Sequence, residues 1–179
     1  TEAGVALAEH DGYEALPAPL RHRRLVVQPA GGPLVVLDRL RTDGSHAVAQ
    51  CWPLHPSLEL ESTADGLALL TRRGERALAL RIEATVPLAL RAERGEAAPP
   101  RGWYSTGLER VEPAWLVAAD LTATDVVDVI ALLWPGAHGP DDTRVELGRG
   151  AVTVALGSGG RVLRLDPDDV ARPVRVVEG

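Results

Sequence analysis

Hydrophobic and polar positions alternate along most of the chain. In the stretch 77–83, Leu78, Leu80 and Ile82 fall on one side of an extended strand, while Arg81 and Glu83 fall on the other. This period of two is the spacing of side chains on a β-strand. The same rhythm recurs at 58–61, 86–90, 115–121, 127–133 and 152–156. The pattern predicts a chain built from about eight or more strands.

Turn residues separate these runs. Asp65-Gly66 and the glycine-rich stretch 157–160 are the clearest hairpin signals, because these residue types adopt the backbone conformations of tight turns. The stretch 42–45 predicts a further turn, which would pair residues 34–40 with 45–54 and bring Asp38 opposite 46–48. The stretches 93–101 and 135–142 carry glycine and proline and predict long loops. These spacings predict an antiparallel meander.

One segment has helical potential, at 123–133, but Val126, Val127, Val129 and Ile130 within it are β-branched. Branching at Cβ favours a strand, here one in a sheet that is buried on both faces. We therefore expect almost no helix. So many strands need a second layer to cover their apolar faces. This predicts an all-β fold, an antiparallel two-sheet β-sandwich of the supersandwich type, with a closed barrel as the alternative. Residues 1–179 are expected to form a single domain.

Composition narrows the classes of function. Of the 179 residues, 45% are hydrophobic, which is too many for a disordered chain, and the formal net charge is −6. Acidic residues are interleaved with the arginines, so we expect no nucleic-acid partner. No apolar run reaches the roughly 18 to 20 residues that cross a bilayer, so we expect no membrane span. The single Cys51 lies in an apolar run, which predicts a buried, inert thiol.

Four histidines and three aspartates lie in the first third of the chain, and side chains of these types form metal sites and acid–base pairs. The histidines lack the close spacing of compact zinc motifs, so ordinary solvated histidines are the better interpretation. No serine lies in a Gly-x-Ser-x-Gly elbow. We expect neither a catalytic residue nor a metal site in this chain. The residues considered are His10, His22, His46, His55, Asp11, Asp38 and Asp43.

Two short stretches carry candidates for substrate binding. Trp103 and Tyr104 follow a Pro-Pro-Arg-Gly stretch, where sequence neighbours bury a large ring poorly. Exposed rings stack on sugars, whereas the usual burial of tryptophan favours the alternative that Trp103 caps one end of the core. His22 and Arg24 belong to an Arg-His-Arg-Arg run, whose guanidinium groups can bind carboxylates or sulfates of an anionic glycan. A solvated, charged strand end is the alternative interpretation of this run.

A series of short motifs resembles a known family. His-Asp-Gly-Tyr at 10–13 precedes the Arg-His-Arg-Arg run at 21–24 and a strand ending at Asp38 and Arg39. Gly-Ser-His at 44–46, Trp-Pro-Leu-His-Pro at 52–56, Gly-Trp-Tyr-Ser at 102–105, Glu-Pro-Ala at 112–114 and Leu-Trp-Pro at 133–135 follow in order. In these motifs and their order, nearly the whole chain resembles the C-terminal β-sandwich of heparinase II/III-like polysaccharide lyases.

The resemblance implies a longer parent enzyme with an N-terminal helical toroid. Such an enzyme cleaves uronic-acid-containing polysaccharides, such as glycosaminoglycans or alginate, by β-elimination at a site between the toroid and the sandwich. The family's catalytic and metal-holding motifs, among them a His-x-His-x-Asp segment, do not occur in these 179 residues. The chain is therefore expected to be the downstream part of the sandwich and to be inert alone.

The resemblance also implies partners and a setting. The expected partners are an anionic polysaccharide and the toroid and early sandwich strands of the parent. A divalent metal would belong to the parent, with no cofactor in this segment, and the protein would be bacterial and periplasmic or secreted. The alternatives are a stand-alone carbohydrate-binding or adhesion module without catalysis, and a purely structural domain.

Overall fold

The computed structural model describes residues 4–136, 143–148, 150–157 and 161–178, and within them it contains strands and no helix. Residues 158–160 of the predicted hairpin turn and most of the predicted loop at 135–142 lie outside the described residues. The strands are β1 (Gly4–His10), β2 (Leu20–Gln28), β3 (Leu34–Pro53), β4 (Glu59–Ala64), β5 (Leu67–Arg72), β6 (Glu75–Ala84), β7 (Leu88–Arg94), β8 (Glu96–Ala97), β9 (Pro100–Arg101), β10 (Trp103–Gly107), β11 (Arg110–Pro113), β12 (Trp115–Pro135), β13 (Thr143–Leu147), β14 (Val152–Leu156), β15 (Arg161–Leu165) and β16 (Val174–Glu178).

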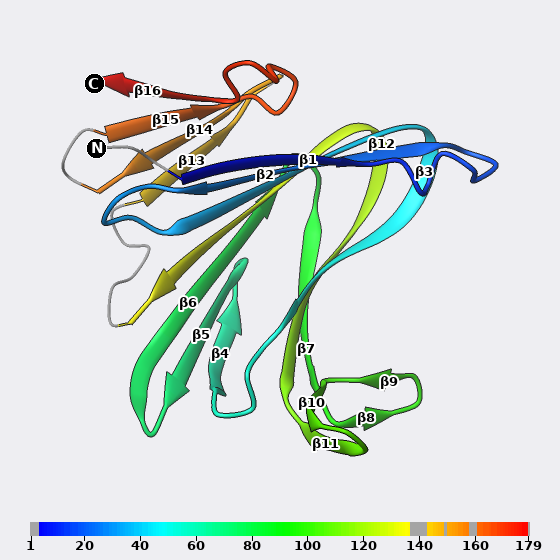
Figure 1. Ribbon diagram of the computed structural model, residues 1–179, viewed down its shortest axis with the longest axis vertical. Coiled ribbons are helices and arrows are strands. Elements are labelled where there is room, and N and C mark those ends of the chain that lie inside the picture. Colours follow the sequence, from blue (N-terminus) through cyan, green and yellow to red (C-terminus); the bar gives the residue numbers. More distant parts are fainter. Residues whose placement is uncertain (1–3, 137–142, 149, 158–160, 179) are drawn as a thin grey trace.

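Two long strands, β3 and β12, organise the molecule. They pair with each other antiparallel along nearly their whole length and bend together, so each belongs to two layers (Figure 1). The first half of β3 and the second half of β12 lie in a main layer of order β1-β2-β3-β12-β6-β5-β4. The second half of β3 and the first half of β12 form a return layer with β7. The predicted antiparallel sandwich is thus confirmed.

The turn predicted at 42–45 was wrong. These residues lie inside β3, and the pairing with β12 shifts between Thr124 and Asp125, which face Ser45 and Thr42 respectively. Asp43 and Gly44 are therefore extra residues on β3, as in a β-bulge. The bulge lets β3 follow the bend instead of reversing.

This corrected path changes the neighbours of Asp38. Its partners across the sheet are Arg24 on β2 and Val129 on β12, and not the stretch 46–48 that a hairpin would have placed there. His46 instead pairs with Ala123 in the return layer.

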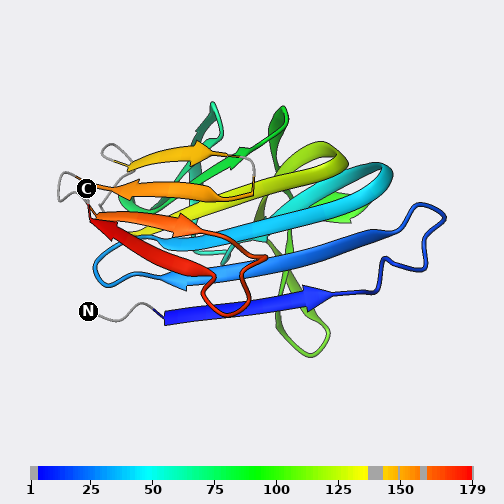
Figure 2. The ribbon, with the colours of Figure 1, turned by 90° about the horizontal axis from the view of Figure 1, so that it is seen from above.

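The main layer is covered on both faces. Val36, Val129 and Ala131 point into a cluster shared with the return layer, while Leu37, Ile130 and Leu132 point into a second cluster. The second cluster is closed by the small sheet β13-β14-β15-β16, which lies against the main layer in Figures 1 and 2. Residues 127–132 are consequently all buried, which confirms burial on both faces for this part of the strand predicted at 123–133, whereas Thr124, Asp125 and Val126 are exposed.

The stretch 93–101 was predicted as a loop but contains the short strands β8 and β9, which pair with each other. Strands of two residues are too short to produce a period in the sequence. Next to them, β10 and β11 form a hairpin at the lower end of the molecule in Figure 1. Among the described residues, no helix is long and apolar enough to cross a membrane.

Candidate functional site

The Arg-His-Arg-Arg run lies on β2, and the alternation of side chains divides it between two faces of the main layer. Leu25 and Val27 on the same strand belong to the cluster beneath the small sheet, so Arg21 and Arg23 share that face. Val26 packs on the cluster shared with the return layer, so His22 and Arg24 share the opposite face. Only the second pair can reach the space between the main and return layers.

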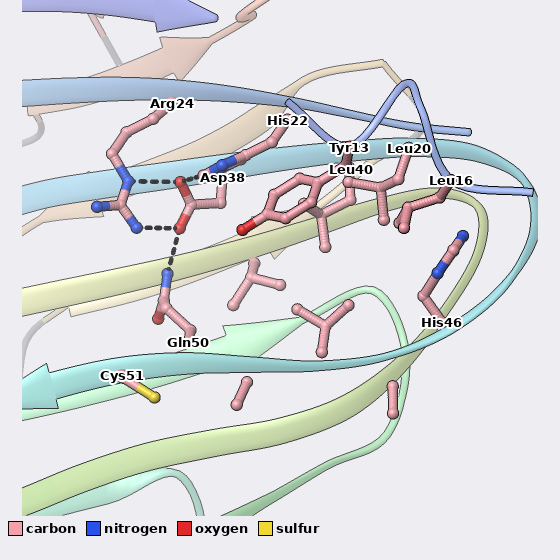
Figure 3. Close-up of a pocket in the computed structure, with 14 residues that line it drawn as sticks. Tyr13, Leu16, Leu20, His22, Arg24, Asp38, Leu40, His46, Gln50 and Cys51 are labelled. Carbon is pink, nitrogen blue, oxygen red and sulfur yellow. Dashed lines mark hydrogen bonds and ion pairs between the residues drawn. The ribbon is translucent and has the colours of Figure 1, made fainter. Parts of the chain in front are cut away.

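His22 and Arg24 converge on Asp38, the residue opposite Arg24 on β3 (Figure 3). Arg24 donates from Nε to Asp38 Oδ1 at 2.6 Å and from Nη2 to Oδ2 at 2.7 Å. His22 Nε2 lies 2.8 Å from Oδ1, and Gln50 donates from Nε2 to Oδ2 at 2.7 Å. Because Gln50 is on the returning half of β3, this carboxylate joins the two layers of the sandwich.

The electrostatics of this group favour a permanent ion pair. Burial alone would raise the pKa of Asp38, but the hydrogen bonds from Arg24, His22 and Gln50 outweigh burial and lower the pKa to about 2. The hydrogen bond to Asp38 in turn raises the pKa of Arg24 above its usual value. The Asp38 side chain is 6% exposed and that of Arg24 is 44% exposed. The carboxylate is therefore a fixed, buried anchor, and the guanidinium faces outward.

A cavity of about 310 Å³ opens beside this group. The segment before β2 supplies Tyr13 and Leu16 to its wall, β2 supplies His22 and Arg24, and the start of the return layer supplies His46. Figure 3 shows the Tyr13 hydroxyl directed toward the Asp38 side of the space, with Leu16 and His46 at the other end. We call this space the Arg24 cavity.

Some polar atoms around the Arg24 cavity have no hydrogen-bond partner among the described residues. Within the part of the chain that the structure describes, Arg24 Nη1 has no hydrogen-bond partner, and the buried His46 Nε2 has none either. Tyr13 is about half exposed. Guanidinium, imidazole and phenol groups around one concave space are the donors that bind a carboxylate or sulfate.

The other face of β2 is occupied by ion pairs. Arg21 donates to Glu14, and Arg23 donates to Glu9 and to Asp168. A further network of ion pairs, which the sequence did not indicate, lies beside them. In it the buried Arg39 donates to both oxygens of Asp128 at 2.8 Å and to Asp168 at 2.6 Å. This network ties the turn before β16 to the main layer. The arginines of this face are thus engaged by carboxylates.

Trp103 and Tyr104 lie elsewhere, on the β10–β11 hairpin. The Trp103 side chain is 42% exposed and belongs to neither core cluster, so the interpretation that it caps the core was wrong. The hairpin projects from the lower end of the sandwich (Figure 1). Tyr104 points away from Trp103 and packs against the His55 ring at 5.3 Å. The structure therefore divides the four predicted binding residues between two regions.

The remaining predicted residues do not assemble into a site. Among the described residues, no three His, Cys, Asp or Glu side chains are grouped as metal ligands would be. His10 packs against Tyr13, and His55 Nδ1 pairs with the Ser57 hydroxyl. Cys51 is exposed, which contradicts the predicted burial, because it projects from the return layer on the side away from the core.

Comparison with solved structures finds this fold in heparinases. A crystal structure of heparinase III matches with a TM-score of 0.68 and 13% sequence identity, covering 91% of this chain and 25% of that chain. Heparan sulfate lyase HepC from Pedobacter heparinus matches with a TM-score of 0.66 and 14% identity, covering 98% of this chain and 25% of that chain. At such identities the likeness is one of fold, and this chain spans about a quarter of each neighbour's length. No curated protein matches the sequence.

The amino-acid sequence carries the family assignment independently of the fold. Residues 1–124 match the family model described as heparinase II/III-like, C-terminal. The match covers more than half of the chain and includes β2, β3 and the residues around Asp38. The chain therefore belongs to the heparinase II/III-like family, as a C-terminal domain of that family.

Proposed function

We propose that this chain is part of a polysaccharide lyase that cleaves a uronic-acid-containing polysaccharide by β-elimination, and that its Arg24 cavity holds an acidic group of that polysaccharide. The family assignment supports the first half of the proposal, as do the heparinase III and heparan sulfate lyase names of the structural neighbours. The second half rests on the residues of this chain.

The observation that carries the binding role is the arrangement of Arg24. Two of its nitrogens are held by the buried Asp38 carboxylate, which fixes the guanidinium plane at the cavity wall. Its third nitrogen has no partner among the described residues, and the His22 and His46 rings line the same cavity. A positive group that is fixed before binding loses little side-chain entropy when an anion arrives, so its contribution to affinity is larger.

In this proposal the bond-breaking chemistry belongs to other parts of the complete protein. The partners are a preceding helical toroid, the early strands of the sandwich and the anionic polysaccharide, and this chain holds no cofactor. Its task is to close one side of the substrate cleft and to orient an acidic sugar. Such a protein would act in the periplasm or outside the cell.

The test uses the complete gene product with heparan sulfate as the probe. The formation of unsaturated uronate is followed by ultraviolet absorbance, and binding by calorimetry. In Arg24→Gln we expect KM to rise about tenfold while kcat changes by less than about twofold, because the lost contact holds the substrate before and during the reaction. Arg24→Lys keeps the charge and is expected to retain part of the affinity. Arg76→Gln removes an equal charge at an exposed position of β6 and should change nothing.

Either of two results contradicts the proposal. An Arg24→Gln protein that melts like the wild type and keeps its KM has no acidic sugar at this cavity. A complete protein that binds the polysaccharide without releasing unsaturated products is a carbohydrate-binding module and not a lyase.

A further inference from the structure

A second cavity lies where the β10–β11 hairpin meets the end of β3 and the beginning of β12. It has a volume of about 560 Å³, within the range of small-ligand pockets. We call it the tryptophan groove. Its lining includes Pro53, Leu54, Arg101, Trp103, Val111 and Trp115.

Both indole rings of the groove are held by their N–H edges. Trp103 donates from Nε1 to the Glu96 carbonyl at 2.8 Å, and Trp115 donates from Nε1 to Glu59 Oε2 at 3.3 Å. The polar atom of each ring is therefore already used. The Arg94 guanidinium lies over the Trp115 ring, 5.7 Å from its centroid, and Trp103 is the more exposed of the two rings. The carbon surface left for a ligand is therefore mainly that of Trp103.

The backbone next to Trp103 is tightly packed around Gly102. The Gly102 carbonyl accepts hydrogen bonds from the amides of Gly95 and Ala114, which joins the entry to β12 with the end of β7. Gly102 has a φ of +69°, and a Cβ at this position would lie 2.7 Å from the Glu93 carbonyl oxygen. The ring is thus carried by a tight turn whose conformation requires glycine.

The charges on and beside the groove wall are balanced in pairs: Arg101 lines the groove, and Arg94 and Glu59 both contact Trp115. Arg101 Nη1 lies 3.1 Å from Glu93 Oε1, and Arg94 Nη1 lies 2.7 Å from Glu59 Oε2. An acidic ligand would meet these carboxylates as well as the arginines. Paired charges do provide donors and acceptors for hydroxyl groups, and the tryptophan faces accept an apolar surface.

We propose that the tryptophan groove binds the pyranose ring of an uncharged sugar. Such a ring has an apolar face of C–H groups for Trp103 and a rim of hydroxyls for the Arg101–Glu93 and Arg94–Glu59 pairs. The inference deepens the proposed function, because it assigns the uncharged sugars of a polysaccharide to the groove and the acidic sugars to the Arg24 cavity. It also makes Trp103, and not Tyr104, the stacking residue of the hairpin.

The experiment titrates the complete protein with chitotetraose, an uncharged oligomer of N-acetylglucosamine, by calorimetry and tryptophan fluorescence. We expect Trp103→Ala to weaken binding at least about tenfold, as loss of a stacking ring does. Val111→Glu changes an exposed residue of the wall, so it should weaken binding without affecting the fold. Tyr104→Ala is the matched control, because it removes a comparably exposed ring from the other side of β10, and should bind as the wild type does.

Three results would overturn the proposal: no binding of chitotetraose, equal binding by wild type and Trp103→Ala, or equal losses in Trp103→Ala and Tyr104→Ala. Salt-sensitive binding of a heparan sulfate fragment that depends on Trp103, with no chitotetraose binding, would assign the groove to charged sugars instead. Arg24→Gln should leave chitotetraose binding unchanged. Failure of the groove can therefore be told apart from failure of the Arg24 cavity.

Discussion

The buried pair of Arg39 and Asp128 offers a quantitative test of the structure. The Arg39 side chain is 1% exposed and that of Asp128 is 4% exposed, and two hydrogen bonds of 2.8 Å join them. Burial by itself would lower the pKa of Arg39, but Asp128 and Asp168 outweigh burial and raise it. The arginine is therefore charged inside the protein and depends on these carboxylates for compensation.

Asp128→Asn keeps the shape of the side chain and removes its charge. Breaking one partner of a buried pair costs roughly 3–5 kcal/mol, because the remaining charge is left without compensation. A domain of this size loses about 2–4 °C of melting temperature per kcal/mol, so the expected decrease is roughly 6–20 °C. Asp168 continues to hold Arg39, which places the result toward the lower end of this range.

The matched control is Asp120→Asn. Asp120 accepts from Arg91 Nε at 2.6 Å, but its side chain is 43% exposed. An exposed ion pair contributes only about 0–1 kcal/mol, so the same substitution should lower the melting temperature by a few degrees at most. Thermal unfolding of the 179-residue chain, followed by circular dichroism, measures both variants. Equal decreases in the two variants would refute the argument that burial sets the cost.

Two further predictions concern residues of the candidate sites. Because the pKa of Asp38 falls from 3.8 to about 2 on folding, its ion pair contributes about 2 kcal/mol of stability above pH 4, which is lost as the pH falls from 4 toward 2. Urea unfolding across this range should show that loss in the wild type and a flatter dependence in Asp38→Asn. Gly102→Ala should lower the free energy of unfolding by about 1–3 kcal/mol, because the new Cβ would lie 2.7 and 2.8 Å from backbone oxygens. The control is Gly107→Ala, whose Cβ would meet no atom within 4 Å, and urea unfolding should find its stability close to that of the wild type.

The sequence was sufficient for the fold class because alternation is a local signal. Apart from Asp128, residues 127–133 are apolar, and three of them are β-branched. This pattern indicates a strand covered on both faces without any knowledge of its partners or its register. The turn at 42–45 failed for the opposite reason. Thr-Asp-Gly-Ser suits a hairpin and a bulge equally well, and only the pairing with β12, some 80 residues away, decides between them.

The candidate sites depended even more on distant partners. His22 and Arg24 could be named from the sequence, but Gln50 could not, because its contact with Asp38 exists only after β3 has bent back. The prediction that Cys51 is buried failed for the same reason. Apolar neighbours in the sequence do not indicate which face of a strand is exposed to solvent. The period of two along β3 did contain a signal, because it puts Gln50 and Cys51 on opposite faces.

The pairing of β2 with β3 explains why the face of β2 with more arginines is not the one proposed to bind an anion. On the face beneath the small sheet, Arg21 lies opposite Arg41 and Arg23 lies opposite Arg39, an arrangement that is destabilising for like charges. Carboxylates from β1, β12 and the turn before β16 compensate these arginines, and so they are not available to a ligand. On the other face Arg24 lies opposite a single carboxylate, whose two oxygens leave one side of the guanidinium uncovered. The proposed binding of an anion therefore rests on the excess of donors over acceptors around one cavity, and the alternation of β2 decides on which face that excess lies.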